Sequence, residues 1–126
     1  MLLIKTHLGD SKISGMGVFA SEFIPKGTLI WQLEAGFDRI FRESDIRCLP
    51  DRCKEWIRHY GYRIKNSHGC YVVCMDNAKY FNHSDEPNTD DTGPLGSVAD
   101  RDIEAGEELT CDYYEFDLDA EIKLAP

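Results

Sequence analysis

The sequence lacks any long hydrophobic run. Its longest apolar stretch, residues 70–75, is far shorter than the ~20 residues that cross a bilayer. The N-terminal residues MLLIKTHLGD do not place a positive region before a long apolar block, so they differ from a secretory signal and are predicted to form a first strand. We therefore expect no membrane association and a cytoplasmic protein, or a nuclear one if the source cell has a nucleus.

Cysteines are few and odd in number, at positions 48, 53, 70, 74 and 111. An odd number in a reducing compartment favours free thiols over disulfides. The close pairs do not have the two-residue gap of a zinc knuckle, and residues 70–75 are typical of a buried strand. We therefore expect thiols in the core rather than metal ligands.

Positive charge is also scarce. Lys and Arg together number 14 against 23 Asp and Glu, which gives a formal net charge of −9. Without a basic footprint, a direct nucleic-acid partner is not expected. An acidic surface suits a cationic partner such as a lysine-rich segment, although solubility alone explains the same excess of acids.

What is present indicates one folded domain of 126 residues, 42% of them hydrophobic. Turn signals at residues 25–27 and 104–107 separate short β-rich runs. Further strands are expected at 71–75, 97–99 and 109–113, with a loop at 85–96 and a short acidic helix or a frayed tail at 117–126. No alternating strand–helix units are seen, so the prediction is a mainly β fold rather than a nucleotide-binding doubly wound sheet.

One helix is predicted, from residue 50 to about residue 60. Pro50 suits a first helical position. A stripe of apolar residues then recurs at helical spacing: Cys53, Trp56, Ile57 and Tyr60. This pattern favours a stripe that faces the core over a cofactor-binding role.

Asn82-His83-Ser84 follows two aromatic residues and precedes a Pro-Asn turn, and three interpretations compete for it. It fits a glycosylation acceptor, but a chain that is not secreted meets no glycosylation machinery. A hydrolytic triad needs side chains that converge, whereas neighbours in an extended segment point apart. A turn that grips a ligand is the remaining interpretation.

Two other segments carry chemistry. In Gly15-Met16-Gly17, the glycines let the backbone bend sharply and approach a ligand, but the third glycine of the dinucleotide fingerprint is missing. The segment GEELTCDYY places a short strand before two neighbouring phenols. Taken alone, each is explained by an ordinary turn or an edge strand.

In this order, SKISGMGVFA, DNAKYFNHSDEPN and GEELTCDYY resemble the SET-domain protein-lysine methyltransferases, especially the compact stand-alone members of bacteria and large viruses. The resemblance covers about residues 3–114. It implies one SET domain over residues 1–126: a mainly β fold with one short helix, several small sheets and a C-terminal pseudoknot, and with 115–126 as a lid or tail.

The resemblance also implies a function. It points to transfer of a methyl group from S-adenosyl-L-methionine to the side-chain amine of a lysine in a basic protein or peptide, with S-adenosyl-L-homocysteine as the product. The alternative is a catalytically silent SET-like module that binds peptide or cofactor. A second copy of the chain that completes the peptide groove, in a homodimer, is left open.

Residue roles follow from the same resemblance. Tyr113 matches the catalytic tyrosine. The residues implied to bind the cofactor are Gly15, Met16, Gly17, Asn82, His83, Tyr113 and Phe116. The residues implied to line the substrate channel are Tyr71, Tyr80 and Cys111. Ser84 is expected to brace its turn rather than touch the ligand.

The sequence departs from many family members after Asn-His-Ser. Asp85 stands where those members have a zinc-binding cysteine, and no cysteine follows Cys111, so no metal is expected. Phe116 is then the candidate lid over the adenine, with an anchor for the tail as the equal alternative. Cys111 stands where the family often controls product multiplicity, and its small side chain predicts di- or trimethylation.

Overall fold

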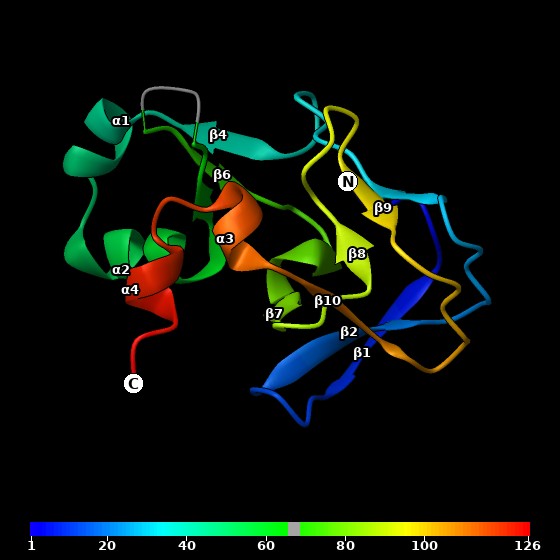
Figure 1. The fold of residues 1–126 in the computed structure, drawn as a ribbon. Helices are drawn as coiled ribbons and strands as arrows, with labels where there is room; N and C mark the ends of the chain where they lie inside the picture. Colours follow the sequence, from blue (N-terminus) through cyan, green and yellow to red (C-terminus); the bar gives the residue numbers. More distant parts are fainter. Residues whose placement is uncertain (66–68) are drawn as a thin grey trace.

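The computed structural model describes residues 1–65 and 69–126 (Figure 1). The strands are β1 (Thr6–Asp10), β2 (Met16–Ala20), β3 (Leu29–Trp31), β4 (Arg39–Phe41), β5 (Tyr62–Arg63), β6 (Tyr71–Val73), β7 (Asn82–His83), β8 (Thr89–Asp90), β9 (Ser97–Ala99) and β10 (Glu108–Cys111). The helices are α1 (Glu43–Arg47), α2 (Asp51–Tyr60), α3 (Tyr113–Phe116) and α4 (Ala120–Lys123), with a 3-10 helix, η1 (Asn77–Tyr80).

The sheet that matters most for function has the strand order β1-β2-β10-β7. Strands β1 and β2 form an antiparallel hairpin, in register from Thr6 opposite Ala20 to Asp10 opposite Met16. Strand β10 pairs antiparallel with β2 on one side and parallel with β7 on the other. A segment near the C-terminus therefore lies between the N-terminal hairpin and the middle of the chain, as Figure 1 shows for the orange strand.

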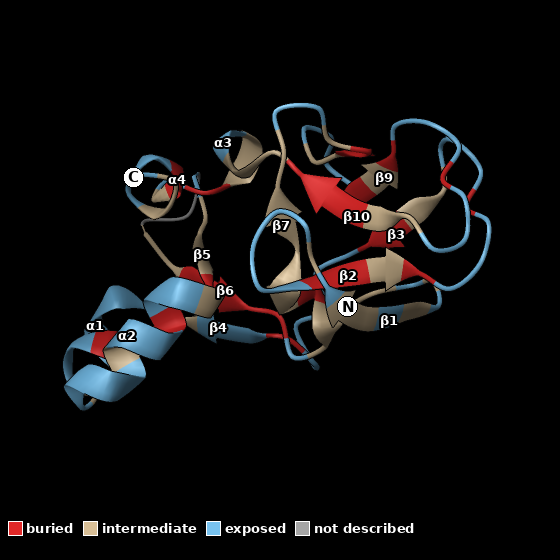
Figure 2. Ribbon diagram, turned by 90° about the horizontal axis from the view of Figure 1, so that it is seen from below, coloured by how far each residue is buried: buried red, intermediate tan, exposed pale blue. Residues whose placement is uncertain are grey.

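Two smaller sheets complete the molecule, with strand orders β3-β9-β8 and β4-β6-β5. Helices α1 and α2 lie beside the β4-β6-β5 sheet at one end, and most of their surface is exposed (Figure 2). Their buried side chains, Ile46 and Ile57, pack with Tyr71 and Val73 in a small cluster.

The main core lies between the β1-β2-β10-β7 and β3-β9-β8 sheets. Its fully buried side chains come from segments far apart in the sequence: Val18, Ile24, Ile30, Ile103 and Leu109. These short strands expose too little apolar surface to be stable singly, so burial against one another stabilises them. Figure 2 shows β2, β3 and β10 meeting in this buried region.

The predicted mainly β class is confirmed, and so are the first strand, which begins at Thr6, and the strand at residues 97–99. The strand expected at 109–113 ends at Cys111 instead. There the Asp112 carboxylate accepts a hydrogen bond of 2.9 Å from Tyr114 N and caps the first turn of α3. The short helix that was one of two expectations for residues 117–126 is present as α4. Within the described residues, α1, α3 and η1 were not expected, because helices of four or five residues are too short to show a period.

The helix expected from Pro50 to Tyr60 is confirmed, but its apolar stripe is not a core stripe. Only Ile57 is buried, while Cys53 is exposed and Trp56 is 45% exposed. The helix lies at the edge of the molecule, so Ile57 is its single residue in the small cluster.

Burial also divides the cysteines. Cys74 and Cys111 are in the core as expected, whereas Cys48 and Cys53 are exposed and Cys70 is half-buried, so the expectation of core thiols is wrong for the first pair. Among the described residues, all five thiols are free, and no group of three or more metal-binding side chains is found. In that same part of the chain, no helix is long and apolar enough to cross a membrane.

Candidate active site

Asn82 ties the middle of the chain to the glycine turn, defined here as residues 15–17. Its side-chain amide lies 3.1 Å from both Ser14 O and Met16 O, and it donates to Glu108 Oε1 at 2.9 Å. Because this amide has only two hydrogens, the three acceptors share them. Asn82 Oδ1 has no hydrogen-bond partner among the residues described, so its acceptor is open to a ligand beside the glycine turn.

Glu108 lies at the centre of this cluster, and no role was expected for it from the sequence. Ser11 Oγ lies 2.8 and 2.9 Å from its two carboxylate oxygens. Gly17 is packed against it so closely that an added Cβ would lie 2.2 Å from Oε1. A side chain at Gly17 would therefore force the Glu108 carboxylate to shift. The Glu-Glu pair at the start of β10 was the available signal, but it did not show which carboxylate faces inward.

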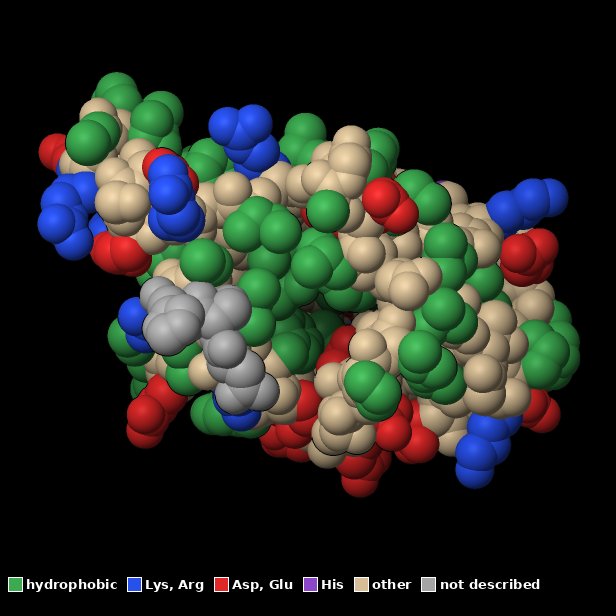
Figure 3. Space-filling view, turned by 90° about the horizontal axis from the view of Figure 1, so that it is seen from above, with side chains coloured by type: hydrophobic (Ala, Val, Ile, Leu, Met, Phe, Trp, Pro, Cys, Tyr) green, Lys and Arg blue, Asp and Glu red, His purple; other side chains and the backbone are tan. Residues whose placement is uncertain are grey.

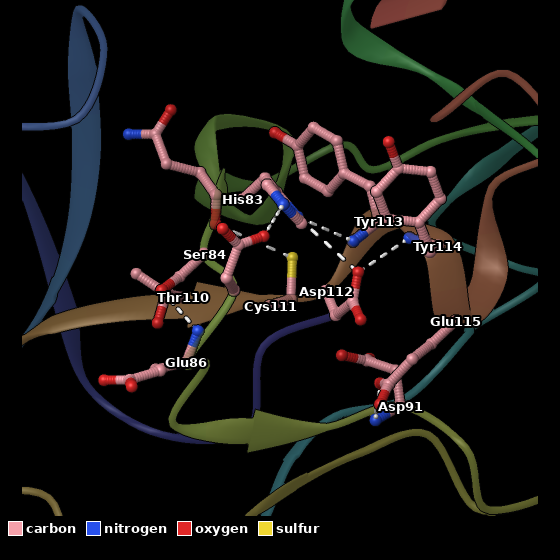
Figure 4. Close-up of polar contacts among 12 residues, drawn as sticks. His83, Ser84, Glu86, Asp91, Thr110, Cys111, Asp112, Tyr113, Tyr114 and Glu115 are labelled. Atoms are coloured by element: carbon pink, nitrogen blue, oxygen red, sulfur yellow. Dashed lines mark hydrogen bonds and ion pairs between the residues drawn. The ribbon is translucent and has the colours of Figure 1, made fainter. Parts of the chain in front are cut away.

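His83 has a defined tautomer when neutral. Tyr113 N donates to its Nδ1 at 3.2 Å, so the ring proton belongs on Nε2, which lies 3.2 Å from Asp85 Oδ1. Asp112 Oδ1 lies 3.6 Å from Nδ1. Figure 4 shows His83, Asp112 and Tyr113 together where β10 ends. The His83 side chain thus holds the start of α3 rather than pointing away as a free ligand.

Tyr113 is fixed at both its backbone and its hydroxyl. The hydroxyl donates to Phe81 O at 2.5 Å, while the backbone N–H reaches His83. Burial raises the pKa of this phenol well above its ordinary value, with the nearby Cys111 adding to the effect. Tyr113 therefore presents a neutral, oriented hydroxyl.

The Pro-Asn turn after Asn-His-Ser packs onto the same strand. Asn88 is buried, donates to Glu108 O at 2.8 Å and accepts from Thr110 N at 2.8 Å. Ser84 Oγ accepts from Glu86 N at 3.1 Å, so Ser84 braces its turn as expected.

A cavity of about 740 Å³ opens beside Tyr113. Of the residues singled out from the sequence, Cys111, Tyr113 and Phe116 line it. Further hydrophobic walls come from residues that the sequence analysis did not select: Trp31, Leu33, Tyr62, Cys74 and Phe81. The space-filling view shows a hollow with hydrophobic walls and acidic side chains along its edge (Figure 3).

Two of the expected channel residues are not in the wall of this cavity. Tyr71 is 5% exposed, and its hydroxyl instead donates to Asp119 Oδ2 at 3.0 Å, within the small cluster beside α2. Tyr80 packs its ring against Tyr60, with centroids 5.7 Å apart. Tyr71 lies in β6 and Tyr80 in η1, and the backbone of these elements directs both rings away from the cavity. Phe81 lines the cavity instead.

Comparison with known proteins shows the family of this chain. The family model described as "SET domain" matches residues 15–114, which include the glycine turn, Asn82 and Tyr113. The chain belongs to the SET-domain family. The resemblance inferred from the three ordered segments is confirmed.

Relatives of this SET domain include larger proteins. A Schizosaccharomyces pombe protein named "Histone-lysine N-methyltransferase, H3 lysine-4 specific" is 32% identical over 120 residues, which are 85% of this chain and 12% of that protein. A Meyerozyma guilliermondii protein named "Histone-lysine N-methyltransferase SET5" is 44% identical over 59 residues, 41% of this chain and 12% of that protein. The chain therefore spans about an eighth of the length of these relatives.

Solved structures share the SET fold. A structure of Chaetomium thermophilum Polycomb Repressive Complex 2, in an autoinhibited conformation and bound to S-adenosylmethionine, has a TM-score of 0.68 and 22% identity, covering 96% of this chain and 16% of that one. An apo form of that complex with two mutations in its Ezh2 subunit gives a TM-score of 0.72 at 21% identity, covering 95% of this chain and 16% of that one. At an identity of 21–22%, the similarity to these structures shows that the chain shares their fold.

Proposed function

We propose that this SET domain is an S-adenosylmethionine-dependent protein-lysine N-methyltransferase. The observation that carries the proposal is the position of Tyr113. Its neutral hydroxyl is fixed on Phe81 O in the wall of a hydrophobic cavity, while its backbone joins the Asn82–His83 segment beside the glycine turn. The names of the relatives, both histone-lysine N-methyltransferases, support the same activity.

The residues beside the glycine turn fit the cofactor. Asn82 Oδ1 is an open acceptor, Gly15 has a left-handed φ of 50° with open space around it, and Met16 is 42% exposed. We assign Asn82 to the amino-acid part of the cofactor, the His83 backbone to the adenine, and the backbone of the glycine turn to the opposite side. When bound, S-adenosylmethionine supplies a methyl group on a positively charged sulfur.

Methyl transfer from a sulfonium to an amine is an in-line displacement with a neutral leaving group. It needs a neutral lysine amine held on line with the methyl, so positioning is the main contribution of the protein. Hydrophobic walls disfavour the ammonium form by desolvation. The Tyr113 hydroxyl oxygen and the backbone carbonyls orient the polarised methyl through weak, directional CH···O contacts.

Phe116 is assigned to the cavity wall and to a lid over the cofactor. Its ring lies 5.1 Å from that of Tyr62 and 6.0 Å from that of Tyr113, centroid to centroid. The tail has polar anchors of its own, including an ion pair of 2.6 Å between Lys123 Nζ and Asp117 Oδ2. Because those contacts hold α4, the ring of Phe116 is not needed as the anchor.

The substrate that we propose is a lysine in a basic protein segment, with histones as the first class to test. The net charge of −9 and the names of the relatives support this choice. The position of β10 between β2 and β7 supports the expected C-terminal pseudoknot.

Calorimetry with S-adenosyl-L-homocysteine tests the cofactor site first. We expect one site on the wild type and a loss of affinity of at least about tenfold in Asn82→Ala, because the amide oxygen that would accept a hydrogen bond from the ligand is removed. Asn77→Ala, which removes an amide in η1, is the matched control and should bind like the wild type. No binding by the wild type would overturn the proposal.

Radiolabelled methyl transfer to histones and to lysine peptides tests the reaction itself. Transfer to a lysine, lost in Tyr113→Phe while S-adenosyl-L-homocysteine still binds, is the expected result. Cofactor binding with no transfer to any lysine substrate in a source-cell lysate would favour the alternative of a silent SET-like binding module.

A further inference from the structure

The surroundings of the Asn82 amide allow it a single orientation. Its nitrogen lies 3.1 Å from both Ser14 O and Met16 O and 2.9 Å from Glu108 Oε1. Carbonyl and carboxylate oxygens accept hydrogen bonds and cannot donate them. An amide turned by 180° would bring its own oxygen against these three acceptors. The nitrogen is therefore held toward them, and Oδ1 stays available to accept a hydrogen bond from a ligand.

Glu108 provides the strongest of the three contacts. Its oxygen is the nearest to the amide nitrogen, and a hydrogen bond to a charged acceptor is roughly twice as strong as one between neutral groups. Within residues 1–65 and 69–126, Glu108 takes part in no ion pair. Hydrogen-bond donors, rather than a cation, therefore stabilise this carboxylate among the described residues.

Glu108 also holds the loop that carries another of the three acceptors. Ser11 Oγ lies 2.8 and 2.9 Å from the two carboxylate oxygens and donates its hydrogen to them. The same hydroxyl oxygen then accepts from Ile13 N at 2.9 Å and from Ser14 N at 3.4 Å. The loop that presents Ser14 O to Asn82 is therefore fixed by the same carboxylate that binds the amide directly.

We propose that Glu108 is a positioning residue for the cofactor, because it sets the orientation of the Asn82 amide so that Oδ1 rather than Nδ2 faces the ligand. The inference rests on the proposed function, since the ligand is the same cofactor. In this role Glu108 acts through Asn82, without touching the cofactor. Glu108→Gln keeps the length of the side chain but can place an amide nitrogen where Oε1 lies, so that both orientations of Asn82 become possible.

Calorimetry with S-adenosyl-L-homocysteine tests whether Glu108 acts through Asn82. The wild type is compared with Glu108→Gln, with Asn82→Ala and with the double variant. We expect Glu108→Gln to weaken binding about tenfold, and the double variant to bind no more weakly than Asn82→Ala, because an absent amide cannot be misoriented. Independent roles would instead multiply the two losses, to about a hundredfold. Multiplied losses, or unchanged affinity in Glu108→Gln, would overturn the inference.

Glu107→Gln is the matched control, because it makes the same chemical change at the preceding residue. The Glu107 carboxylate is bound elsewhere: it pairs with Arg101 at 2.8 Å and accepts from Glu104 N at 3.2 Å. We expect Glu107→Gln to bind S-adenosyl-L-homocysteine like the wild type. An equal loss in Glu107→Gln would assign the effect to the loss of any negative charge beside β10 and would count against the inference.

NMR on the same proteins without cofactor observes the orientation itself. In the wild type we expect nuclear Overhauser contacts between the side-chain amide protons of Asn82 and the protons of the glycine turn, and we expect Glu108→Gln to weaken them. Their absence from the folded wild type would overturn the inference. A wild type that shows these contacts but binds no S-adenosyl-L-homocysteine confirms the orientation and removes the methyltransferase proposal. Normal binding by both the wild type and Glu108→Gln removes only the role of Glu108.

Discussion

At the scale of single residues, the side chain of Cys111 decides how much room lies beside Tyr113. It is 2% exposed and lines the cavity, and its Sγ lies 3.9 Å from Asn82 O. A thiol is smaller than a phenol and cannot hold a water in the same way. A lysine that already carries one or two methyl groups therefore has room to rotate into line.

We predict di- or trimethylated products from the wild type and a shift toward monomethyl-lysine in Cys111→Tyr. Mass spectrometry of a good peptide substrate measures the product distribution. Cys111→Ala removes the thiol without adding a phenol and should leave the distribution unchanged. A wild type that stops at one methyl after long incubation contradicts the prediction.

The Asp91 carboxylate is partly buried, and its ionisation affects the stability of the fold. Burial raises its pKa above the ordinary value, and the nearby charges of Glu115 and Asp90 act in the same direction, against hydroxyl donors that lower it. Because the folded state holds this proton more tightly than the unfolded chain, the ionised carboxylate opposes folding at neutral pH.

We therefore predict that Asp91→Asn raises the free energy of unfolding at neutral pH. The gain should shrink as the pH falls through the raised pKa of Asp91, and it should vanish below the ordinary aspartate pKa, where the carboxyl is protonated in both states. Urea unfolding at several pH values measures this. A gain that does not change with pH would contradict the assigned cause.

At the scale of elements, β10 organises the site. Its first residue is Glu108 and its last is Cys111, and Tyr113 follows in α3. The hairpin of β1 and β2 approaches from one side, where Ser11 and Gly17 meet Glu108. The geometry of the glycine turn thus depends on a strand near the other end of the chain.

Gly17→Ala should disrupt this contact. The new Cβ would lie 2.2 Å from Glu108 Oε1 and 3.1 Å from Ser11 Cβ, so the carboxylate must move away from the groups that it binds. We expect a loss of about 1–3 kcal/mol in urea unfolding, with weaker S-adenosyl-L-homocysteine binding. Gly93→Ala, which meets nothing within 4 Å, should stay within about 0.5 kcal/mol of the wild type. Equal effects of the two changes would show that the packing at Gly17 is not the cause.

At the scale of the whole molecule, the net charge of −9 should attract positively charged substrates. We predict that the KM for a lysine peptide flanked by arginines rises several-fold between about 0.05 and 0.5 M salt, because salt screens charges beyond the Debye length. The KM for the same lysine flanked by serines should change little. Steady-state kinetics on the two peptides provides the measurement, and indifference to both flanking charge and salt would refute the electrostatic argument.

Across the whole molecule, the sequence by itself determined the family, the mainly β class, the turns at residues 25–27 and 104–107, and the longest helix. Each of these features depends on residues close together in the chain. Short motifs in a fixed order indicate the family, glycines at positive φ lie in the turns, and a helical period predicts the helix. The same local patterns predict Asn82, His83 and Tyr113 as site residues, because their motifs carry them together.

Tertiary structure alone decided which side chains meet. Ser11 and Glu108 are separated by 97 residues and Asn82 and Met16 by 66, and they touch because β10 lies between β2 and β7. The sequence could not show that Tyr71 packs away from the cavity while Phe81 lines it, because the direction of a side chain is set by strand pairing and by the packing of distant segments. Hydrogen bonds and hydrophobic contacts between remote residues leave no periodic trace in the chain, so Glu108 and Asp91 became visible only in the folded molecule.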